Sequence, residues 1–258
     1  MRYTQEQAAI LHIEEIAPGV YNTVLSAKTI ASAASAGQFV QGLCEPYQLR
    51  RPISIAGFDP ALGILRLIFE VRGKGTAWLA QRQKGDSLDL IGPLGHGFPL
   101  TDASKKAVLV GGGIGTPPLL PPAQFHGANA TVITGFRTAS AAILQADFAA
   151  SGAKTILCTD DGSAGFHGFT TEALEQRLSE GDVGVVYTCG PKVMMKGVAK
   201  LAEEAGAVCY VSMEERMGCG VGACLGCTCK TKNEQGGTQM TRVCLNGPVF
   251  RSTEVDWT

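Results

Sequence analysis

Four cysteines near the end of the chain carry the clearest chemistry in the sequence. Cys219, Cys224, Cys227 and Cys244 follow the pattern C-x4-C-x2-C, then sixteen residues, then C. This is the spacing of plant-type 2Fe-2S ligands. Three thiolates on one tight loop and a fourth from a distant turn can close around two irons. The glycines between them leave backbone N–H groups free to point at the sulfurs. The pattern predicts an iron–sulfur cluster.

A structural zinc site is the alternative for the same cysteines. Zinc is usually held by cysteine pairs at x2–4 spacing, often two such pairs. Here three cysteines share one glycine-rich loop and the fourth stands alone, which favours the 2Fe-2S cluster. Using Cys229 in place of Cys227 would destroy the Cys-x2-Cys pair, so Cys229 is predicted not to be a ligand.

A glycine-rich turn follows the apolar run at residues 106–110 and is a candidate nucleotide site. Glycine permits a tight turn and a close approach to a pyrophosphate, and the start of a helix supplies N–H donors. An ordinary strand-to-helix turn would look the same. The candidate NAD-binding residues here are Gly111, Gly112, Gly113, Gly115 and Thr116.

Two later segments strengthen the nucleotide interpretation. Cys189, Gly190 and Pro191 end a predicted strand, where ligands bind in open α/β sheets, although a buried and inert cysteine is the simpler reading. Asp160 and Asp161 follow another predicted strand. They fit a solvated turn, or they repel a 2′-phosphate and so favour NADH over NADPH.

Two segments in the first third of the chain could bind a second dinucleotide. Arg51, in Arg-Pro-Ile-Ser-Ile, offers a guanidinium fork for phosphate, and Ser54 a hydroxyl for a flavin. A surface arginine beside an edge-strand proline is the alternative. The segment Gly73-Lys74-Gly75-Thr76 opens a short helix at 75–82, whose N–H groups and threonine hydroxyl suit a diphosphate. Thr76 is expected to cap this helix.

The elements that must position these residues fall into three regions. Up to about residue 100, six short apolar or alternating runs punctuated by Gly, Pro and Asp predict an antiparallel barrel or sandwich. They lie at 8–16, 20–27, 38–43, 52–58, 64–71 and 87–91.

Residues 105–212 alternate strand and helix, which predicts a parallel sheet with helices on both faces. The expected strands are 106–110, 130–134, 154–159, 184–189 and 209–212, and the expected helices 139–150, 171–178 and 192–204. Residues 213–258 carry no long periodic element and are too few to fold without a metal.

Composition excludes several classes of protein. The net charge is −1, which argues against nucleic acid as the main partner, and the hydrophobic fraction of 45% excludes intrinsic disorder. The chain shows neither a membrane-spanning run nor a secretory signal, and its nine cysteines lack the pattern of a disulfide framework. These features predict a cytoplasmic protein without membrane partners.

The three regions together resemble the ferredoxin-NADP reductase superfamily. With the cysteine-rich end, the chain is similar to the electron-transfer subunits of class 1B dihydroorotate dehydrogenases. The resemblance implies a multidomain β plus α/β chain: an FAD-binding β-barrel at 1–102, an NAD-binding α/β domain at 103–212 and a 2Fe-2S domain at 213–258. It rests on the segments quoted above together with Gly37-Gln38-Phe39 and Gly92-Pro93-Leu94-Gly95.

The resemblance also implies site residues and partners. FAD would be bound by Arg51, Pro52, Ile53, Ser54, Ile68, Phe69, Glu70, Gly75 and Thr76. Hydride would pass between NAD and FAD, and single electrons through the cluster. The implied partner is an FMN-containing catalytic subunit that oxidises dihydroorotate to orotate in pyrimidine synthesis, in a two-plus-two heterotetramer; this chain would hold no pyrimidine site.

Other functions stay open on sequence alone. A flavin and iron–sulfur subunit of a hydrogenase, sulfite reductase or transhydrogenase would share these regions, and a zinc-stapled nucleotide-binding regulator would belong to another class. Two positions depart from the family pattern. Ser35-Ala36 precede Gly37 where a proline is usual, and Pro121-Pro122 are expected to break the first helix of the nucleotide domain.

Overall fold

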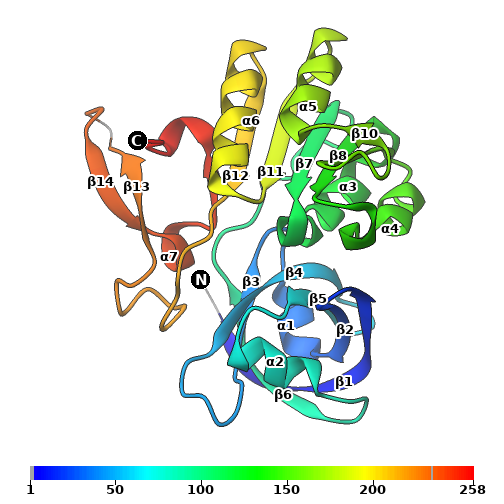
Figure 1. Cartoon of the computed structure of the whole chain (residues 1–258). Coiled ribbons are helices and arrows are strands. Elements are labelled where there is room, and N and C mark those ends of the chain that lie inside the picture. The colour runs from blue at the N-terminus through cyan, green and yellow to red at the C-terminus, as the bar shows by residue number, and fades with distance from the viewer. Residues whose placement is uncertain (1–2, 234) are drawn as a thin grey trace. The chain divides into compact units, whose positions relative to one another are not determined.

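In this computed structural model, six antiparallel strands close into a barrel in the first part of the chain. The barrel is drawn in blue to cyan in Figure 1. The structure describes residues 3–233 and 235–258. The strand order is β1-β2-β5-β4-β3-β6. The strands are β1 (Thr4–Ala17), β2 (Val20–Ser26), β3 (Phe39–Gly42), β4 (Arg51–Asp59), β5 (Ile64–Glu70) and β6 (Ser87–Leu94). Each coincides with one of the six predicted runs, and the sheet is a barrel rather than a sandwich.

Alternation along the strands separates a packed interior from an outer face. The interior includes Val40 of β3, Ile53 and Ile55 of β4, and Leu67 and Phe69 of β5, all buried. Residues between them on the same strands point outward. The outer face of β3 and β4 is therefore available for other segments of the chain and for ligands.

Two short helices accompany the barrel, of which only one was predicted. Helix α2 (Lys74–Ala80) lies where expected, but Thr76 is its third residue rather than its cap. Its hydroxyl accepts hydrogen bonds from the N–H groups of Arg72 (2.9 Å) and Gly73 (3.3 Å). The unpredicted helix, α1 (Lys28–Ala33), begins where the Glu6 carboxylate accepts hydrogen bonds from two backbone N–H groups, at 2.9 and 3.1 Å.

A seven-stranded sheet forms the second part of the structure, in the order β10-β9-β8-β7-β11-β12-β15. The strands are β7 (Ala107–Gly112), β8 (Ala130–Phe136), β9 (Lys154–Thr159), β10 (Phe166–His167), β11 (Val185–Cys189), β12 (Val208–Ser212) and β15 (Val249–Arg251). The first six are parallel to their neighbours, and β15 joins β12 antiparallel. The five predicted strands are all present, whereas β10 and β15 were not expected.

Helices α3 (Leu120–His126), α4 (Gln145–Ala150), α5 (Thr170–Ser179) and α6 (Lys192–Glu204) accompany this sheet (Figure 1). The expectation for Pro121 and Pro122 was wrong: they do not break α3 but occupy its first turn, where proline is tolerated. The predicted helix at 139–150 is divided. A 3-10 turn at Ala139–Ala141 precedes Leu144, whose left-handed φ of 64° marks the start of α4.

The C-terminal segment consists of short elements, as its lack of periodicity predicts. They are the hairpin β13 (Thr228–Lys232) and β14 (Thr238–Arg242), then α7 (Val243–Asn246), then β15. Two compact units result. One combines the barrel, up to Gly97, with Glu214–Cys229 and Arg242–Pro248; the other combines Phe98–Met213 with Lys230–Thr241 and Val249–Thr258. No helix in the described part of the chain has the length and hydropathy to cross a membrane.

Candidate cofactor sites

Arg51 and Gly75, which are far apart in the sequence, meet at the start of α2. A Cβ placed on Gly75 would lie 2.9 Å from Cζ of Arg51, so only glycine lets the guanidinium lie against this turn. The Arg51 Nη1 donates to the carbonyl of Leu49 at 2.6 Å, and the rest of the fork is available for a ligand. A guanidinium over helix N–H groups is an arrangement that binds phosphate oxygens. The residues present fit a diphosphate.

Arg51 is positioned by its neighbour in the chain. The Arg50 guanidinium forms a mostly buried ion pair with Asp89 of β6, at 2.9 Å, and also donates to the carbonyls of Asp89 (2.9 Å) and Gln41 (3.3 Å). The carboxylate of Asp89 further accepts from Gln5 at 2.8 Å. This network fixes the backbone that carries Arg51. Sequence analysis missed it, because nothing in the local pattern distinguishes Arg50 from an exposed arginine.

The remaining FAD candidates divide between the two faces of the barrel wall. Alternation along β4 and β5 places Pro52, Ser54, Ile68 and Glu70 on the outer face, whereas the side chains of Ile53 and Phe69 belong to the interior. Phe69 stacks there on Tyr21, with ring centroids 5.7 Å apart. Ile53 and Phe69 can therefore face an outer ligand only through their backbone.

The glycine-rich turn and the Cys189 segment come together in the second unit. Cys189 ends β11 directly opposite Gly111 of β7. A Cβ on Gly115 would lie 2.6 Å from the carbonyl oxygen of Cys189 and 2.6 Å from Cα of Gly190, so no other residue fits this approach. A Cβ on Gly112 would lie 2.7 Å from the sulfur of Met194 and 2.8 Å from Cδ of Pro191. The carboxyl ends of β7 and β11 thus form one glycine-lined edge, the place where open α/β sheets bind nucleotides.

Thr116 supplies an unpaired polar group at this edge. The residue is fully buried and its hydroxyl has no hydrogen-bond partner. Buried hydroxyls are usually paired, so the unpaired hydroxyl of Thr116 is an exception that calls for a functional explanation. Gly113, in contrast, has open space beside it and a left-handed φ of 52°, which makes its role one of turn geometry.

Asp160 lies at the same edge of the sheet but two strands away from the glycine turn, after β9. Its side chain is exposed. The Asp161 carboxylate accepts from the N–H and hydroxyl of Ser163, at 2.9 and 2.6 Å, and these bonds lower its pKa. Asp161 therefore stabilises its own turn, and Asp160 is the carboxylate left to face a ligand.

The four cysteines of the C-x4-C-x2-C…C pattern gather in one compact unit, as two pairs. Cys219 and Cys224 form one thiol contact, and Cys227 and Cys244 the other. The N–H groups of Ala223 and Cys224 donate to the Cys219 sulfur at 3.3 and 3.4 Å. That of Cys244 donates to the Cys227 sulfur at 3.4 Å. Backbone N–H groups therefore point at sulfurs, as expected from the glycine-rich loop.

The thiols differ in their readiness to ionise. Burial raises the pKa of Cys219, but hydrogen bonds from the N–H groups of Cys224, Val221 and Ala223 outweigh it and bring this pKa to about 7. Burial, together with the neighbouring Cys227, raises the pKa of Cys244 to about 12. A bound cation would remove this penalty, because metal binding displaces the thiol protons.

The arrangement of the four thiols bears on the kind of centre that they fit. Among residues 3–233 and 235–258, no three His, Cys, Asp or Glu side chains are grouped so as to hold one metal ion. A 2Fe-2S centre needs two ligands on each of two irons, which is the arrangement that two thiol pairs can supply. Cys229, two residues beyond Cys227, is buried in β13.

The loop around these cysteines is held on one side and open on the other. The guanidinium of Arg242 donates to the carbonyl of Gly222 at 2.7 Å, and the N–H of Val243 to that of Cys227 at 2.8 Å. Cys244 and Cys227 are buried, whereas Cys224 is exposed and Leu225 is 63% exposed. Leu225 adopts a left-handed φ of 57° at the tip of the loop.

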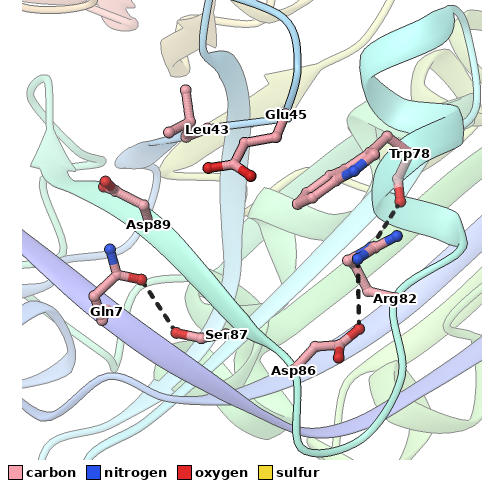
Figure 2. A pocket seen from close by; sticks show the side chains of 8 residues that line it. All are labelled: Gln7, Leu43, Glu45, Trp78, Arg82, Asp86, Ser87 and Asp89. Atoms are coloured by element: carbon pink, nitrogen blue, oxygen red, sulfur yellow. Dashed lines mark hydrogen bonds and ion pairs between the residues drawn. The ribbon is translucent and has the colours of Figure 1, made fainter.

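A separate cavity of about 240 Å³ opens on the barrel at the far end of α2 (Figure 2). Its wall is acidic, with the carboxylates of Glu45, Asp86 and Asp89 around one space. Arg82 stacks over Trp78 at 4.2 Å and pairs with Asp86 at 3.7 Å. None of the FAD candidates lines this cavity.

Comparisons with known proteins identify the family that the chain resembles along its length. Residues 214–256 match the family model described as the iron-sulfur cluster binding domain of dihydroorotate dehydrogenase B. The chain is 42% identical to the dihydroorotate dehydrogenase B (NAD(+)) electron transfer subunit of Geobacillus thermodenitrificans, over 97% of this chain and 98% of that protein. It is 39% identical to the subunit of the same name from Desulforamulus reducens, over 97% of each.

A solved structure is also similar over nearly the whole chain. It is that of an NADH-dependent reduced ferredoxin-NADP oxidoreductase, studied for flavin-based electron bifurcation. The TM-score is 0.87 at 29% identity, covering 98% of this chain and 90% of that one. An Amycolatopsis cytochrome P450 reductase shares the fold alone, with a TM-score of 0.67 at 22% identity over 79% of this chain and 66% of that one. The full-length relatives decide the matter: the chain belongs to the family of dihydroorotate dehydrogenase B (NAD(+)) electron transfer subunits.

Proposed function

We propose that this protein is the subunit that carries electrons between NAD and an FMN-containing catalytic subunit that oxidises dihydroorotate to orotate. The observation that carries the proposal is the convergence of four cysteines in two pairs, in a chain that matches such subunits along its length. When bound, FAD exchanges a hydride with NAD and single electrons with a 2Fe-2S cluster. The chain itself holds no pyrimidine site in this proposal.

The barrel residues bind and orient the flavin cofactor. Arg51 and the N–H groups at Gly75 and Thr76 neutralise and hold the diphosphate. Pro52 and Ser54 present the outer face of β4 to the ring system, and Ile68 and Glu70 that of β5. The Arg50–Asp89 pair keeps Arg51 in place before the cofactor arrives, which reduces the entropy lost on binding.

The glycine-lined edge binds NAD. Gly111, Gly112, Gly113 and Gly115 let the pyrophosphate approach the backbone, and the unpaired hydroxyl of Thr116 gives it a partner. Cys189, Gly190 and Pro191 form the neighbouring wall. Asp160 disfavours the 2′-phosphate of NADPH by charge repulsion, so NADH is the preferred nucleotide.

Cys219, Cys224, Cys227 and Cys244 hold the cluster. Backbone N–H groups around the sulfurs offset the negative charge of the thiolates and of the cluster. Leu225 and its small neighbours at the loop tip form an apolar patch that fits the dry centre of a subunit contact. The assembly proposed is a two-plus-two heterotetramer, and its reduced thiols suit the cytoplasm.

A second candidate function follows from the structural similarity alone. The NADH-dependent reduced ferredoxin-NADP oxidoreductase, at a TM-score of 0.87, shows that the same architecture serves another electron-transfer complex. A flavin and iron–sulfur subunit of that class would bind the same cofactors and differ in its partner. The higher identity to the dihydroorotate dehydrogenase subunits favours the first proposal.

Purification of the native complex tests the proposal. We expect a second chain that contains FMN, whereas this chain contains FAD and iron. Adding dihydroorotate to the complex should reduce NAD⁺. A complex that lacks FMN and does not react with dihydroorotate would transfer the assignment to the second candidate. A colourless chain that contains zinc would make it a nucleotide-binding regulator.

A further inference from the structure

Gln41 is completely buried although it points away from the barrel interior. Its neighbour Val40 belongs to the interior, so alternation along β3 places Gln41 on the outer face. The cysteine-bearing segment covers it there. The Gln41 Nε2 lies 4.0 Å from the sulfur of Met217, and a Cβ on Gly220 would come within 2.6 Å of the same side chain. The segment Met217–Gly220, which contains Cys219, therefore rests on this amide.

The carboxamide of Gln41 is poorly paired for a buried group. Its Oε1 has no hydrogen-bond partner, and the contact of its Nε2 with the Met217 sulfur is long. Buried side-chain amides are nearly always hydrogen-bonded, and an exception calls for a functional explanation. An apolar side chain of the same size would fill the space without leaving a polar atom unpaired.

The backbone of Gln41 connects the two predicted redox sites. Gln41 pairs with Pro52 across β3 and β4, in the stretch that carries the FAD candidates. Neighbouring strands are separated by about 4.8 Å. The Gln41 carbonyl accepts from Arg50, the residue whose ion pair with Asp89 fixes Arg51. Gln41 thus stands between the flavin-binding strand and the residue that follows Cys219.

We propose that Gln41 is a positioning residue for electron transfer: its side chain holds the segment Met217–Gly220, and with it Cys219, against the flavin strand. This inference rests on the proposed cluster assignment. Groups that orient metal ligands influence both the affinity and the potential of a metal centre, and their loss lowers metal affinity or activity about 10–100-fold. Gly220 is required for this contact, because its φ of 73° and the approach of Gln41 both exclude a side chain.

Substitution of Gln41 by a residue of similar size separates this role from packing. We expect Gln41→Leu to keep FAD and iron, to shift the cluster potential and to slow cluster reduction by NADH about tenfold. Gln7→Leu, an exposed glutamine of β1, is the control and should change none of these quantities. Wild-type values of both the cluster potential and the reduction rate in Gln41→Leu would overturn the proposal.

A double-mutant cycle tests the contact even if single variants lose the cluster. Gly220→Ala should lower the iron content, and adding Gln41→Ala should restore part of it by making room for the new methyl group. Gly222→Ala is the matched control, since its φ of 84° gives similar strain but its Cβ would meet Leu245 instead. Equal effects of Gln41→Ala in both backgrounds would overturn the proposal. Retention of iron by Cys219→Ser would instead refute the cluster assignment itself.

Discussion

The guanidinium of Arg51 occupies the space beside Gly75 that any larger residue would fill. The first residue of β4 and the start of α2, more than twenty residues apart in the sequence, are thereby brought together, and we expect them to bind the FAD diphosphate jointly. The contact explains why a glycine stands inside the first turn of α2, where alanine would otherwise be the better helix former. It also makes the two residues interdependent.

Loss of the Arg51 side chain should weaken FAD binding. Charge-assisted hydrogen bonds contribute about 1.5–3 kcal/mol, so Arg51→Ala should raise the dissociation constant roughly 10–100-fold. Fluorescence titration of the FAD-free protein measures this. Arg82→Ala, which removes an arginine at the other end of the same helix region, should leave FAD affinity nearly unchanged. Equal affinities for the two variants would place the diphosphate elsewhere.

Cys219→Ser should remove iron and spare the flavin, because the cysteines and the FAD candidates lie on different elements. Iron analysis and the visible spectrum give the result directly. Cys229→Ser is the control: Cys229 lies only two residues beyond Cys227 but should not be a ligand, so iron should be retained. Iron loss in Cys229→Ser with retention in Cys219→Ser would reverse the ligand assignment.

A charge at the loop tip should disrupt assembly with the catalytic subunit. Leu225 is 63% exposed among small residues, so Leu225→Glu should weaken the complex at least about tenfold while NADH oxidation by an artificial acceptor continues. Leu62, which is 74% exposed on the barrel, offers the matched change Leu62→Glu with no expected effect. Analytical ultracentrifugation and dihydroorotate turnover report both properties. An intact complex with full turnover in Leu225→Glu would move the interface to another surface.

The wild-type protein should prefer NADH to NADPH, and Asp160 should contribute to the preference. Removing its charge in Asp160→Asn should raise kcat/KM for NADPH about threefold or more, with little change for NADH. Asp161 is unsuitable for the test, because its carboxylate holds Ser163. Comparable kcat/KM values for the two nucleotides in the wild type would contradict the prediction.

His126 should make the stability of the compact unit that contains the seven-stranded sheet depend on pH. The side chain is 4% exposed, and burial lowers its pKa below the usual value of 6.5. The unfolded chain therefore binds a proton at His126 more readily than the folded chain does. The free energy of unfolding should fall as the pH drops below about 6.5. His126→Gln should flatten the dependence of Tm on pH between 7 and 5.5. His12→Gln, at an exposed histidine of β1, should leave it unchanged.

Local patterns in the sequence were enough to predict most strands and the cysteine pattern. The barrel strands alternate or form short apolar runs between turn residues, and the five predicted parallel strands are compact runs rich in β-branched residues. The cysteine, glycine-turn and Arg-Pro-Ile-Ser segments are likewise contiguous. Their detection needs no knowledge of distant contacts.

Features that depend on distant residues could not be predicted. Helix α1 begins at the carboxylate of Glu6, more than twenty residues earlier. Strand β15 has only three residues, and its partner β12 is needed to recognise it. The burial of Gln41 arises only when Gly220, some 180 residues later, covers it. A lone polar residue in a short strand gives no local sign of this.

The pairing of β15 with β12 has a consequence for engineering. The cluster-bearing region cannot be removed as a separate domain. The residues that follow it, in β15, also complete the edge of the nucleotide-binding sheet. A chain shortened at Met213 would expose the backbone donors and acceptors of β12, and uncovered strand edges invite self-association. Loss of the metal centre by truncation would therefore be confounded with aggregation, and point substitution is the cleaner way to remove it.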